Sequence, residues 1–333
     1  MKILITGATS GLGRNAIDFA LKNELSPTGT GRNARVLADL SGLGVKTFQA
    51  DLTTLPTAQL HAMVAGQDAI WHCAALSSPW GRYEDFYAAN VTASERLFQM
   101  AAECAIPIFV HISTPALYFD FSHQYHVHEG KLASVFVNNY ALTKAMAESS
   151  LAALARENPQ TRLIVLRPRA IFGPHDRVLF PRLLRILSDR NGTIPLPRGG
   201  RTILDLSYVE NVVHAMWLAT LTSVPSGSVF NITNDAPLSA REALIRLFQE
   251  ELGRPLRIRD VPYPILAGTA IAMEQISRVT GKEPPFTRYS IGALAFDMTL
   301  DISAAKRSLG YTPIVQLPEA FSRTAKWLKA HHD

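Results

Sequence analysis

Short apolar runs alternate along the chain with segments whose apolar residues recur at helical spacing. The run Met1–Thr6 meets the glycine cluster Gly7–Gly13, and Asn15–Leu21 then presents one apolar helix face. The further strands that the pattern predicts are Ala69–Cys73, Ile108–Ile112, Leu163–Leu166 and Val229–Ile232, and the further helices are Ala89–Ala102, Tyr140–Ala155 and Tyr208–Leu221. Strands joined by helical crossovers build a parallel sheet with helices on both faces.

The pattern becomes irregular after Arg167-Pro168, where glycine and proline interrupt the chain as far as Gly199-Gly200. Together with the length of 333 residues, this change predicts one large α/β unit with an appended lobe. The expected fold class is therefore α/β, a Rossmann-type doubly wound parallel sheet with a smaller C-terminal lobe. We expect residues 1–170, rejoined by about 203–235, in the sheet domain, and residues 171–202 and 236–333 in the lobe.

Composition excludes several classes of protein. A hydrophobic share of 47% and a charged share of 18% exclude a chain that is disordered throughout. Cys73 and Cys104 are the only cysteines, which excludes a disulfide-stapled scaffold, and no leader pattern precedes the first predicted strand, so we expect a cytoplasmic protein. The uncharged run Val261–Met273 is shorter than the roughly 20 residues of a spanning helix and predicts a core or interfacial helix.

The charge pattern does not favour nucleic acid as a partner. The net charge of +5 comes from 33 Lys and Arg against 28 Asp and Glu, and no block of like charge concentrates it. Nine arginines fall between Arg162 and Arg201, against only Asp176 and Asp189. Two interpretations of these arginines stay open, a lobe that meets an anionic ligand or a set of solvated helix faces.

A glycine-rich turn joins the first predicted strand to the first predicted helix. Gly7, Gly11 and Gly13 would let the backbone approach a pyrophosphate closely, and the positive end of the helix would attract its charge. Glycine turns also occur where only the backbone geometry requires glycine. This turn by itself therefore leaves open whether it binds a phosphate group or serves the fold alone. The other turn residues of this candidate site are Thr9, Ser10 and Leu12.

The residues at the end of the next predicted strand indicate which dinucleotide, NAD(H) or NADP(H), the site would bind. Thr30-Gly31-Arg32-Asn33 stands where an acidic side chain would bind both ribose hydroxyls and repel a 2′-phosphate. Glycine followed by arginine leaves room for that phosphate and supplies a guanidinium, so the sequence favours NADP(H) over NAD(H). Asp51-Leu52 follows the apolar stretch Val45–Phe48, where Asp51 either meets the adenine amino group or forms a turn.

Tyr140 and Lys144 stand four residues apart, so a helix puts the phenol and the ammonium group on one face. A phenol with a pKa of about 10 is a poor base at neutral pH, and an adjacent cation stabilises the phenolate. The pair lies downstream of the glycine turn and of the strand that leads to Ser113-Thr114. A Tyr-x-x-x-Lys spacing is common by chance, but its position after these two motifs favours a functional pair.

Further motifs extend this pattern over nearly the whole chain: Thr6-Gly7, Asp51-Leu52, His72-Cys-Ala74-Ala75, Asn90-Val91, Ser113-Thr114-Pro115, Tyr140-x-x-x-Lys144, Leu166-Arg-Pro168-x-x-x-x-Gly173-Pro174, Tyr208-Val-Glu-Asn-Val212, Pro284-Pro-Phe-Thr-Arg288, Asp301 and Leu309-Gly-Tyr-Thr-Pro313. The set resembles the short-chain dehydrogenase/reductase superfamily, in its extended, epimerase-like type. The later motifs are most similar to the 3β-hydroxysteroid dehydrogenase branch, which includes bacterial reductases of 3-keto acids. One feature departs from the extended pattern, because Gly7, Gly11 and Gly13 have the spacing of the shorter members.

The resemblance implies a role for each matching residue. Tyr140 would exchange a proton with the substrate oxygen during hydride transfer, and Lys144 would lower its pKa and hold the nicotinamide ribose. Thr114, or else Ser113, would hydrogen-bond the same oxygen, and the alternative for both hydroxyls is strand-end capping. The remaining implied site residues are Asn90 beside the site, Asn33 near the ribose, and Ala74, Ala75, Arg167 and Pro168 along the cofactor.

Two weaker signals have plain alternatives. The histidine-rich segment His123–Glu129 carries residue types that bind metals, but hydride transfer between carbon atoms needs no metal, so we predict no metal site and a solvated loop. Trp80, Tyr83 and Phe86 are either the wall of an apolar pocket or ordinary core packing.

We expect an NADP(H)-dependent oxidoreductase that interconverts a secondary alcohol and a ketone on an apolar small molecule, bound by the C-terminal lobe. One alternative is a nucleotide-sugar epimerase or dehydratase, although Pro115 stands where dehydratases use a carboxylate. A second alternative is a redox sensor that binds NADP(H) without catalysis, a class that commonly lacks the Tyr-Lys pair. A homodimer is expected, because the two central helices carry apolar residues beyond one face and the resembling family pairs them across a two-fold axis.

Overall fold

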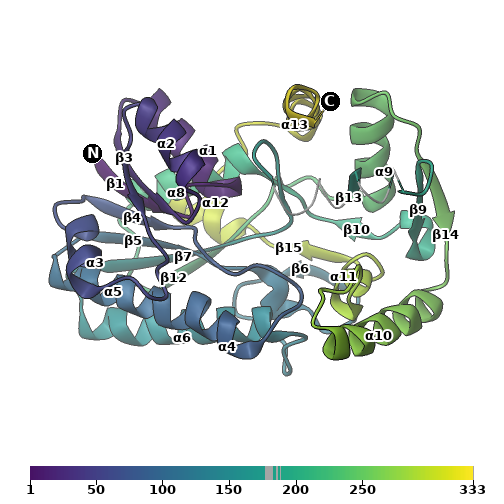
Figure 1. Ribbon diagram of the computed structural model, residues 1–333, viewed down its shortest axis with the longest axis horizontal. Coiled ribbons are helices and arrows are strands. Elements are labelled where there is room, and N and C mark those ends of the chain that lie inside the picture. The colour runs from purple at the N-terminus through teal and green to yellow at the C-terminus, as the bar shows by residue number, and fades with distance from the viewer. Residues whose placement is uncertain (177–182, 185–186, 188, 333) are drawn as a thin grey trace.

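A computed structural model describes residues 1–176, 183–184, 187 and 189–332 (Figure 1). Seven parallel strands form its central sheet in the order β12-β7-β5-β4-β1-β2-β3. The strands are β1 (Lys2–Thr6), β2 (Ser26–Gly31), β3 (Lys46–Gln49), β4 (Ala69–His72), β5 (Ile108–Ile112), β7 (Arg162–Pro168) and β12 (Ser228–Ile232). The strand order reverses direction between β1 and β4, which confirms the predicted doubly wound sheet.

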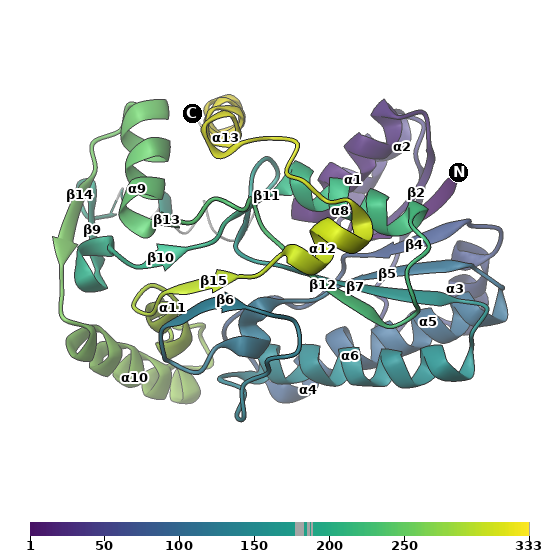
Figure 2. The same cartoon turned by 180° about the vertical axis from the view of Figure 1, so that it is seen from behind.

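Helices cover both faces of this sheet (Figures 1 and 2), because successive strand residues point to opposite sides. On one face Ile5 and Trp71 belong to a core completed by α1 (Gly11–Lys22), α2 (Ala34–Gly42), α8 (Val209–Leu221) and α12 (Ser303–Leu309). On the other face Leu4 and Phe109 belong to a core completed by α3 (Thr57–Val64), α5 (Ala93–Glu103) and α6 (Asn139–Glu157).

The helix predicted over Ala89–Ala102 begins earlier than the sequence indicated. The short α4 (Tyr83–Phe86) runs into a π-helical turn, η1 (Tyr87–Thr92), and then into α5. Phe86 is buried four residues before the buried Asn90, so it continues the inward stripe of the helix. Of the aromatic residues in this segment, Phe86 is buried in the helix, and both Trp80 and Phe86 line a cavity described below, so both interpretations of the aromatic residues hold in part.

A smaller lobe lies beyond the carboxyl ends of the central strands (Figure 2). Its four-stranded sheet has the order β13-β10-β15-β6, formed by β6 (Gln124–Val127), β10 (Ile203–Leu204), β13 (Leu238–Ser239) and β15 (Met298–Leu300). Two small parallel pairs join β8 (Ile171–Phe172) to β11 (Ser207–Tyr208) and β9 (Thr193–Leu196) to β14 (Arg257–Asp260). Further helices with described bounds are η2 (Pro115–Tyr118), η3 (Pro197–Gly200), α9 (Ala240–Leu244), η4 (Ile245–Glu251), α10 (Tyr263–Thr280), α11 (Arg288–Ala293) and α13 (Leu317–His332).

The apolar run Val261–Met273 lies largely in α10, at the edge of the lobe (Figure 1). Ile265, Ile276 and Val279 of this helix are exposed, while Ala270 is buried. Among the described helices, none has the length and apolar character of a segment that spans a bilayer.

The helix faces that suggested a homodimer are largely used within the chain. α5 packs directly against α6. Of the six apolar residues that extend beyond the sheet-facing stripes, four are buried in the single chain, namely Ala93, Leu97, Met100 and Leu151, and two are partly exposed, namely Met146 and Leu154.

Candidate active site

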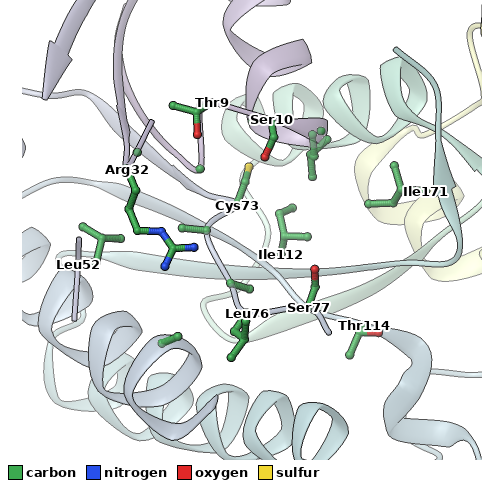
Figure 3. Close-up of a pocket in the computed structure, with 18 of the residues that line it drawn as sticks. Thr9, Ser10, Arg32, Leu52, Cys73, Leu76, Ser77, Ile112, Thr114 and Ile171 are labelled. Atoms are coloured by element: carbon green, nitrogen blue, oxygen red, sulfur yellow. The ribbon is translucent and has the colours of Figure 1, made fainter. Parts of the chain in front are cut away.

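A cavity of about 880 Å³ opens at the carboxyl ends of the central strands, where ligands bind in doubly wound folds (Figure 3). Its lining begins at the first residues beyond β1, β2, β4 and β5. The predicted site residues that line it are Gly7, Thr9, Ser10, Gly11, Leu12, Gly13, Arg32, Asp51, Leu52, Ala74, Ala75, Ser113, Thr114, Tyr140 and Pro168. The predicted residues that do not line it are Asn33, Asn90, Lys144 and Arg167.

The glycine turn is shaped by close backbone contact. Gly7 has a φ of +67°, and a Cβ atom on Gly13 would stand 2.3 Å from the Gly7 carbonyl oxygen. Ser10 precedes α1 without capping it through its side chain. The first turn of a helix has N–H groups that lack intrahelical partners, so this end of α1 fits a phosphate group.

The outer end of the cavity carries Arg32, directly after β2 (Figure 3). A Cβ atom on Gly31 would lie 2.6 Å from Thr9 Cγ2, so glycine is required beside the turn. Arg32 Nη1 lies 3.9 Å from Asp51 Oδ2, and 79% of the arginine side chain is exposed. Asp51 Oδ1 accepts hydrogen bonds from the Thr53 N–H and hydroxyl, which lower the pKa of the carboxyl group. Asp51 therefore forms the turn that the sequence allowed and lines the cavity as well.

Asn33 serves the helix that follows and not the cavity. Its side-chain oxygen accepts a hydrogen bond of 3.1 Å from the Val36 N–H, which caps α2.

Tyr140 stands at the inner end of the cavity, in the first turn of α6. Burial raises the pKa of its phenol to about 12, and a hydrogen bond with the Thr114 side chain acts in the opposite direction. The Thr114 hydroxyl also accepts from the Ala116 N–H at 3.2 Å, so it caps η2. Ser113 Oγ is buried and has no hydrogen-bond partner among the described residues. The Thr114 hydroxyl therefore interacts with both the phenol and the backbone of η2.

Lys144 lies one turn further along α6 and is 1% exposed. Its Nζ donates to the Ile112 carbonyl oxygen at 2.6 Å and lies 2.9 Å from His111 Nε2. Burial lowers the pKa of Lys144 to about 8, and the Glu148 carboxylate acts in the opposite direction.

Two histidines support this arrangement, and sequence reasoning gave neither a role. The rings of His72 on β4 and His111 on β5 lie 5.4 Å apart, and burial lowers the pKa of both. His72 is hydrogen-bonded to the Thr6 hydroxyl at 2.8 Å and to the Ser94 hydroxyl at 2.9 Å. The sequence did carry a signal for these two residues. Each is a histidine within an otherwise apolar strand, and the two histidines are paired across neighbouring strands.

Asn90 holds the loop that follows β4. Its Oδ1 accepts from the Leu76 N–H at 2.8 Å, and its Nδ2 donates to the Leu76 carbonyl at 3.1 Å and to Thr143 Oγ1 at 3.1 Å. Asn90 therefore ties the cavity wall at Leu76 to α6, although its own side chain does not reach the cavity.

Arg167 is directed away from the cavity, in contrast to Pro168. Its guanidinium binds both carboxylate oxygens of Glu148, and Nη1 donates to the Tyr118 hydroxyl at 2.7 Å and the Glu129 carbonyl at 2.8 Å. A buried guanidinium requires such partners, and these come from α6 and from the segments around η2 and β6. Successive strand residues point to opposite sides, so only one of the pair lines the cavity.

A second cavity, of about 1120 Å³, adjoins the first, since Asp85 lines both. Its aromatic lining residues are Trp80, Phe86, Phe121, Phe136 and Tyr289. The Phe86 ring centroid lies 6.5 Å from that of Tyr140, which places Tyr140 at the border of the two cavities.

The histidine-rich segment forms β6 and its flanks. His123 Nδ1 lies 3.0 Å from Asp297 Oδ2. Within the described part of the chain, no three His, Cys, Asp or Glu side chains gather as metal ligands would. Of the nine arginines between Arg162 and Arg201, Arg177, Arg182 and Arg185 lie outside the described residues.

Comparison with known proteins identifies the family. The NAD dependent epimerase/dehydratase family matches residues 3–233. The chain belongs to this family, which confirms the resemblance to extended short-chain dehydrogenases/reductases.

Its relatives include reductases and dehydrogenases. The chain is 44% identical to the uncharacterized protein YbjS of Escherichia coli, over 99% of this chain and 98% of that protein. It is 31% identical to 2-alkyl-3-oxoalkanoate reductase of Stenotrophomonas maltophilia, over 97% and 98% of the two chains. It is 27% identical to sterol-4-alpha-carboxylate 3-dehydrogenase, decarboxylating, of Saccharomyces cerevisiae, over 85% and 83% of the two chains.

Among solved structures, UDP-glucose 4-epimerase of Thermotoga maritima is similar with a TM-score of 0.79 and 20% identity, over 100% of both chains. A likeness at this identity shows the shared fold.

Proposed function

We propose that this protein is an NADP(H)-dependent oxidoreductase that interconverts a secondary alcohol and a ketone on an apolar substrate. The observation that carries the proposal is the position of Tyr140, at the border between a cavity with a phosphate-binding turn and a second cavity with aromatic walls. Relatives named as a reductase and as a dehydrogenase support the reaction class.

The first cavity fits a dinucleotide. The turn Gly7–Gly13 would hold the diphosphate at the start of α1, and Arg32 would pair with a 2′-phosphate at the outer end. When bound, the dinucleotide supplies or accepts the hydride. The Ser113 hydroxyl, which has no partner among the described residues, and the Pro168 side chain would line the nicotinamide half.

The residues around Tyr140 would control the transfer of a proton between its phenol and the substrate oxygen. With a pKa raised to about 12 by burial, the phenol is protonated at neutral pH and can donate to a carbonyl oxygen in the direction of reduction. The Thr114 hydroxyl would hydrogen-bond the same oxygen and stabilise the charge that develops there. In the direction of oxidation the phenolate must form, and the Lys144 ammonium group one turn away is the cation that would stabilise it.

The proposal is tested by mixing the purified protein with NADPH or NADH and a panel of apolar ketones, and following nicotinamide absorbance. We expect steady consumption of NADPH with equimolar formation of the alcohol. An epimerase or dehydratase regenerates its cofactor, so turnover of a nucleotide sugar without net NADPH consumption would replace this proposal with the epimerase alternative. Tight NADPH binding with no turnover of any ketone or secondary alcohol would favour the redox sensor.

The homodimer stays a prediction of this proposed function. Met146 and Leu154 are the two partly exposed members of the apolar set on α5 and α6. Light scattering at micromolar concentration should give the mass of two chains. A fully active monomer would show that the apolar excess of these helices serves packing within one chain.

A further inference from the structure

His111 occupies a buried position on β5 and contacts Lys144 of α6. The ring is fully buried, and its Nε2 lies 2.9 Å from Lys144 Nζ. Lys144 Nζ also donates to the Ile112 carbonyl oxygen at 2.6 Å. An ammonium group carries donors and no acceptor, so the imidazole must accept at Nε2. The neutral ring of His111 therefore has its proton on Nδ1.

The other ring nitrogen shows that packing alone does not explain His111. Nδ1 is buried and has no hydrogen-bond partner among the described residues. On the central sheet His111 is paired with His72 of β4 and with Val165 of β7. A buried donor without an acceptor is costly, and an apolar ring of similar size would avoid that cost. Within the described part of the chain, the contact with Lys144 is the one hydrogen bond that the His111 side chain makes.

The neighbouring histidine, His72, has partners at both ring nitrogens. Ser94 donates its hydroxyl to the Asn90 carbonyl oxygen at 2.7 Å, so Ser94 Oγ must accept from His72 Nε2, which lies 2.9 Å away. The Thr6 hydroxyl lies 2.8 Å from His72 Nδ1 and donates to it. His72 and His111 thus carry their protons on opposite nitrogens, although their rings lie 5.4 Å apart. His72 joins parts of the fold, whereas His111 contacts the lysine.

The two acceptors of the Lys144 ammonium group are both neutral. One is the Ile112 carbonyl oxygen and the other is the His111 imidazole. Burial lowers the pKa of His111 well below its usual value, and the charge of Lys144 acts in the same direction, so the ring stays neutral. The Cys73 thiol also lies near enough to act on Lys144, and burial raises the pKa of this thiol to about 12, so it is neutral as well.

Glu148 is the carboxylate that acts on Lys144, one turn further along α6, and both of its oxygens are bound by Arg167. A carboxylate in the place of His111 would neutralise the ammonium group, and an apolar side chain would remove an acceptor and favour the loss of its proton. A neutral acceptor avoids both results. It keeps Lys144 charged, and this charge can act on the phenol of Tyr140, which stands one turn earlier on the same helix.

We propose that His111 is a positioning residue for Lys144: its neutral imidazole accepts a hydrogen bond from the ammonium group and so holds a charged lysine beside Tyr140. The inference rests on the proposed function, because it gives the lysine the task of stabilising the Tyr140 phenolate when an alcohol is oxidised. His111 does not line the first cavity, so it acts through Lys144 and not on the substrate or the dinucleotide.

The kinetic test follows the oxidation of an apolar secondary alcohol by NADP+ as a function of pH in the wild type and in His111→Phe. The hydride passes to NADP+ and the hydroxyl proton to the Tyr140 phenolate, so the rate rises with pH as the phenol ionises. His111→Phe keeps a ring of similar size and removes the acceptor. We expect kcat/KM at neutral pH to fall by about 10- to 100-fold, because the rise of the rate moves up by about one to two pH units. At high pH, where the phenolate forms without the lysine, the rate should recover.

Two further variants separate this role from a structural one. His111→Gln offers a side-chain oxygen as acceptor, so it should keep a larger part of the rate at neutral pH than His111→Phe does. His214→Phe changes a histidine of α8 whose ring lies 6.4 Å from that of Tyr311, and it should leave the pH profile unchanged. An unchanged profile in His111→Phe, or a loss of the same size at every pH, would overturn the proposal. Equal losses in His111→Gln and His111→Phe would overturn it as well, since an acceptor would then make no difference.

A spectroscopic measurement keeps the inference separate from the proposed function. Nitrogen NMR of the imidazole rings distinguishes the two neutral forms of histidine, and the signals of His111 are those that disappear in His111→Gln. We expect the proton on Nδ1 in His111 and on Nε2 in His72, in the protein without substrate. The Nε2 signal of His111 should move in Lys144→Met, which removes the donor, and stay in place in Lys22→Met.

A proton on His111 Nε2, or an Nε2 signal that is the same in Lys144→Met, would overturn the proposal even if the protein oxidises alcohols. If the signals are as expected and no alcohol is oxidised, the hydrogen bond that holds Lys144 stands and the proposed function alone fails.

Discussion

The inner wall of the cleft and its outer rim differ in how their polar side chains are accommodated, by hydrogen bonds within the protein or by exposure to solvent. The inner wall, formed by His72, Asn90, His111 and Lys144 behind Tyr140, is almost fully buried. Its side chains are hydrogen-bonded to one another, to the backbone or to neighbouring hydroxyl groups, and only His111 Nδ1 among these described residues lacks a partner. On the outer rim, the Arg32 side chain is 79% exposed and its neighbouring carboxylate is 3.9 Å away.

This difference separates two kinds of specificity. The inner wall excludes water and fixes its groups, so under the proposed function we expect a change there to alter both the reaction and the stability of the fold. The outer rim is open to solvent and salt, so under the proposed function we expect a change there to affect which nucleotide binds and to leave the reaction intact. The expected effects of substitutions therefore decrease from the inner wall outward.

The largest effect is expected for Tyr140→Phe. Turnover should fall by roughly 10²–10⁴, the usual contribution of a positioned acid or base, and NADPH affinity should hold because the ring remains. Steady-state assays and a fluorescence titration measure the two quantities. Tyr125→Phe changes an exposed tyrosine and is the matched control. Unchanged turnover in Tyr140→Phe would place the proton transfer elsewhere.

Lys144→Met should weaken both cofactor binding and turnover, since the lysine is proposed to serve the ribose and the phenolate together. Loss of a hydrogen bond from a charged group predicts a fall in NADPH affinity of about 10- to 100-fold. Lys22→Met, at an exposed lysine at the end of α1, is the control. A Lys144 variant that lost substrate binding alone would contradict the double role.

The buried histidines of the inner wall should also make the free energy of unfolding depend on pH. Burial lowers the pKa of His72 to about 3, so below pH 6.5 the unfolded chain takes up a proton that the folded chain refuses. Stability should therefore be full above pH 6.5 and fall as the pH decreases, by about 1.4 kcal/mol at pH 5.5 for this one histidine.

Denaturant unfolding at pH 7.5 and 5.5 measures this loss. In His72→Gln the difference in unfolding free energy between the two pH values should shrink by about the same 1.4 kcal/mol. His61→Gln, at an exposed histidine on α3, should keep the wild-type difference. An undiminished difference in His72→Gln would mean that His72 does not resist protonation in the folded state.

The smallest effect is expected at the outer rim. The wild type should bind NADPH at least about tenfold more tightly than NADH, equivalent to 1.4 kcal/mol, and Arg32→Ala should remove most of this ratio without changing NADH affinity. Added salt should reduce the ratio, since the side chain is exposed. Arg35→Ala, at the next arginine of the rim, is the comparison. If the ratio collapsed in Arg35→Ala and survived in Arg32→Ala, the phosphate would be bound by Arg35.

The sequence was informative where a local pattern decides the structure. The strands Ile108–Ile112 and Lys2–Thr6 lie where their apolar runs predicted them, and Arg32 follows directly on β2 as the cofactor argument requires. The strand β6 was not foreseen, because a four-residue segment with polar side chains has no periodicity to detect. It was interpreted as a histidine-rich loop.

The hydrogen-bond partners of Arg167 could not be predicted from sequence. The partners of Arg167 come from residues 19, 38 and 49 positions away, and only the folded chain brings them to β7. Local motifs therefore predicted the glycine turn and Tyr140 in the lining of the first cavity, whereas contacts between distant segments could not be predicted from them.

The small sheet of the lobe has a consequence for how the chain is made. Its strands β6, β10, β13 and β15 come from residues 124–127, 203–204, 238–239 and 298–300, so the sheet can close only when nine-tenths of the polypeptide has left the ribosome. Until then β6 has no neighbour, because it pairs with β15 alone. Every strand of the central sheet precedes residue 233, so that sheet can pair before the sheet of the lobe, whose strand β15 ends at Leu300. We therefore expect the closing of the lobe to come late in the folding of the chain.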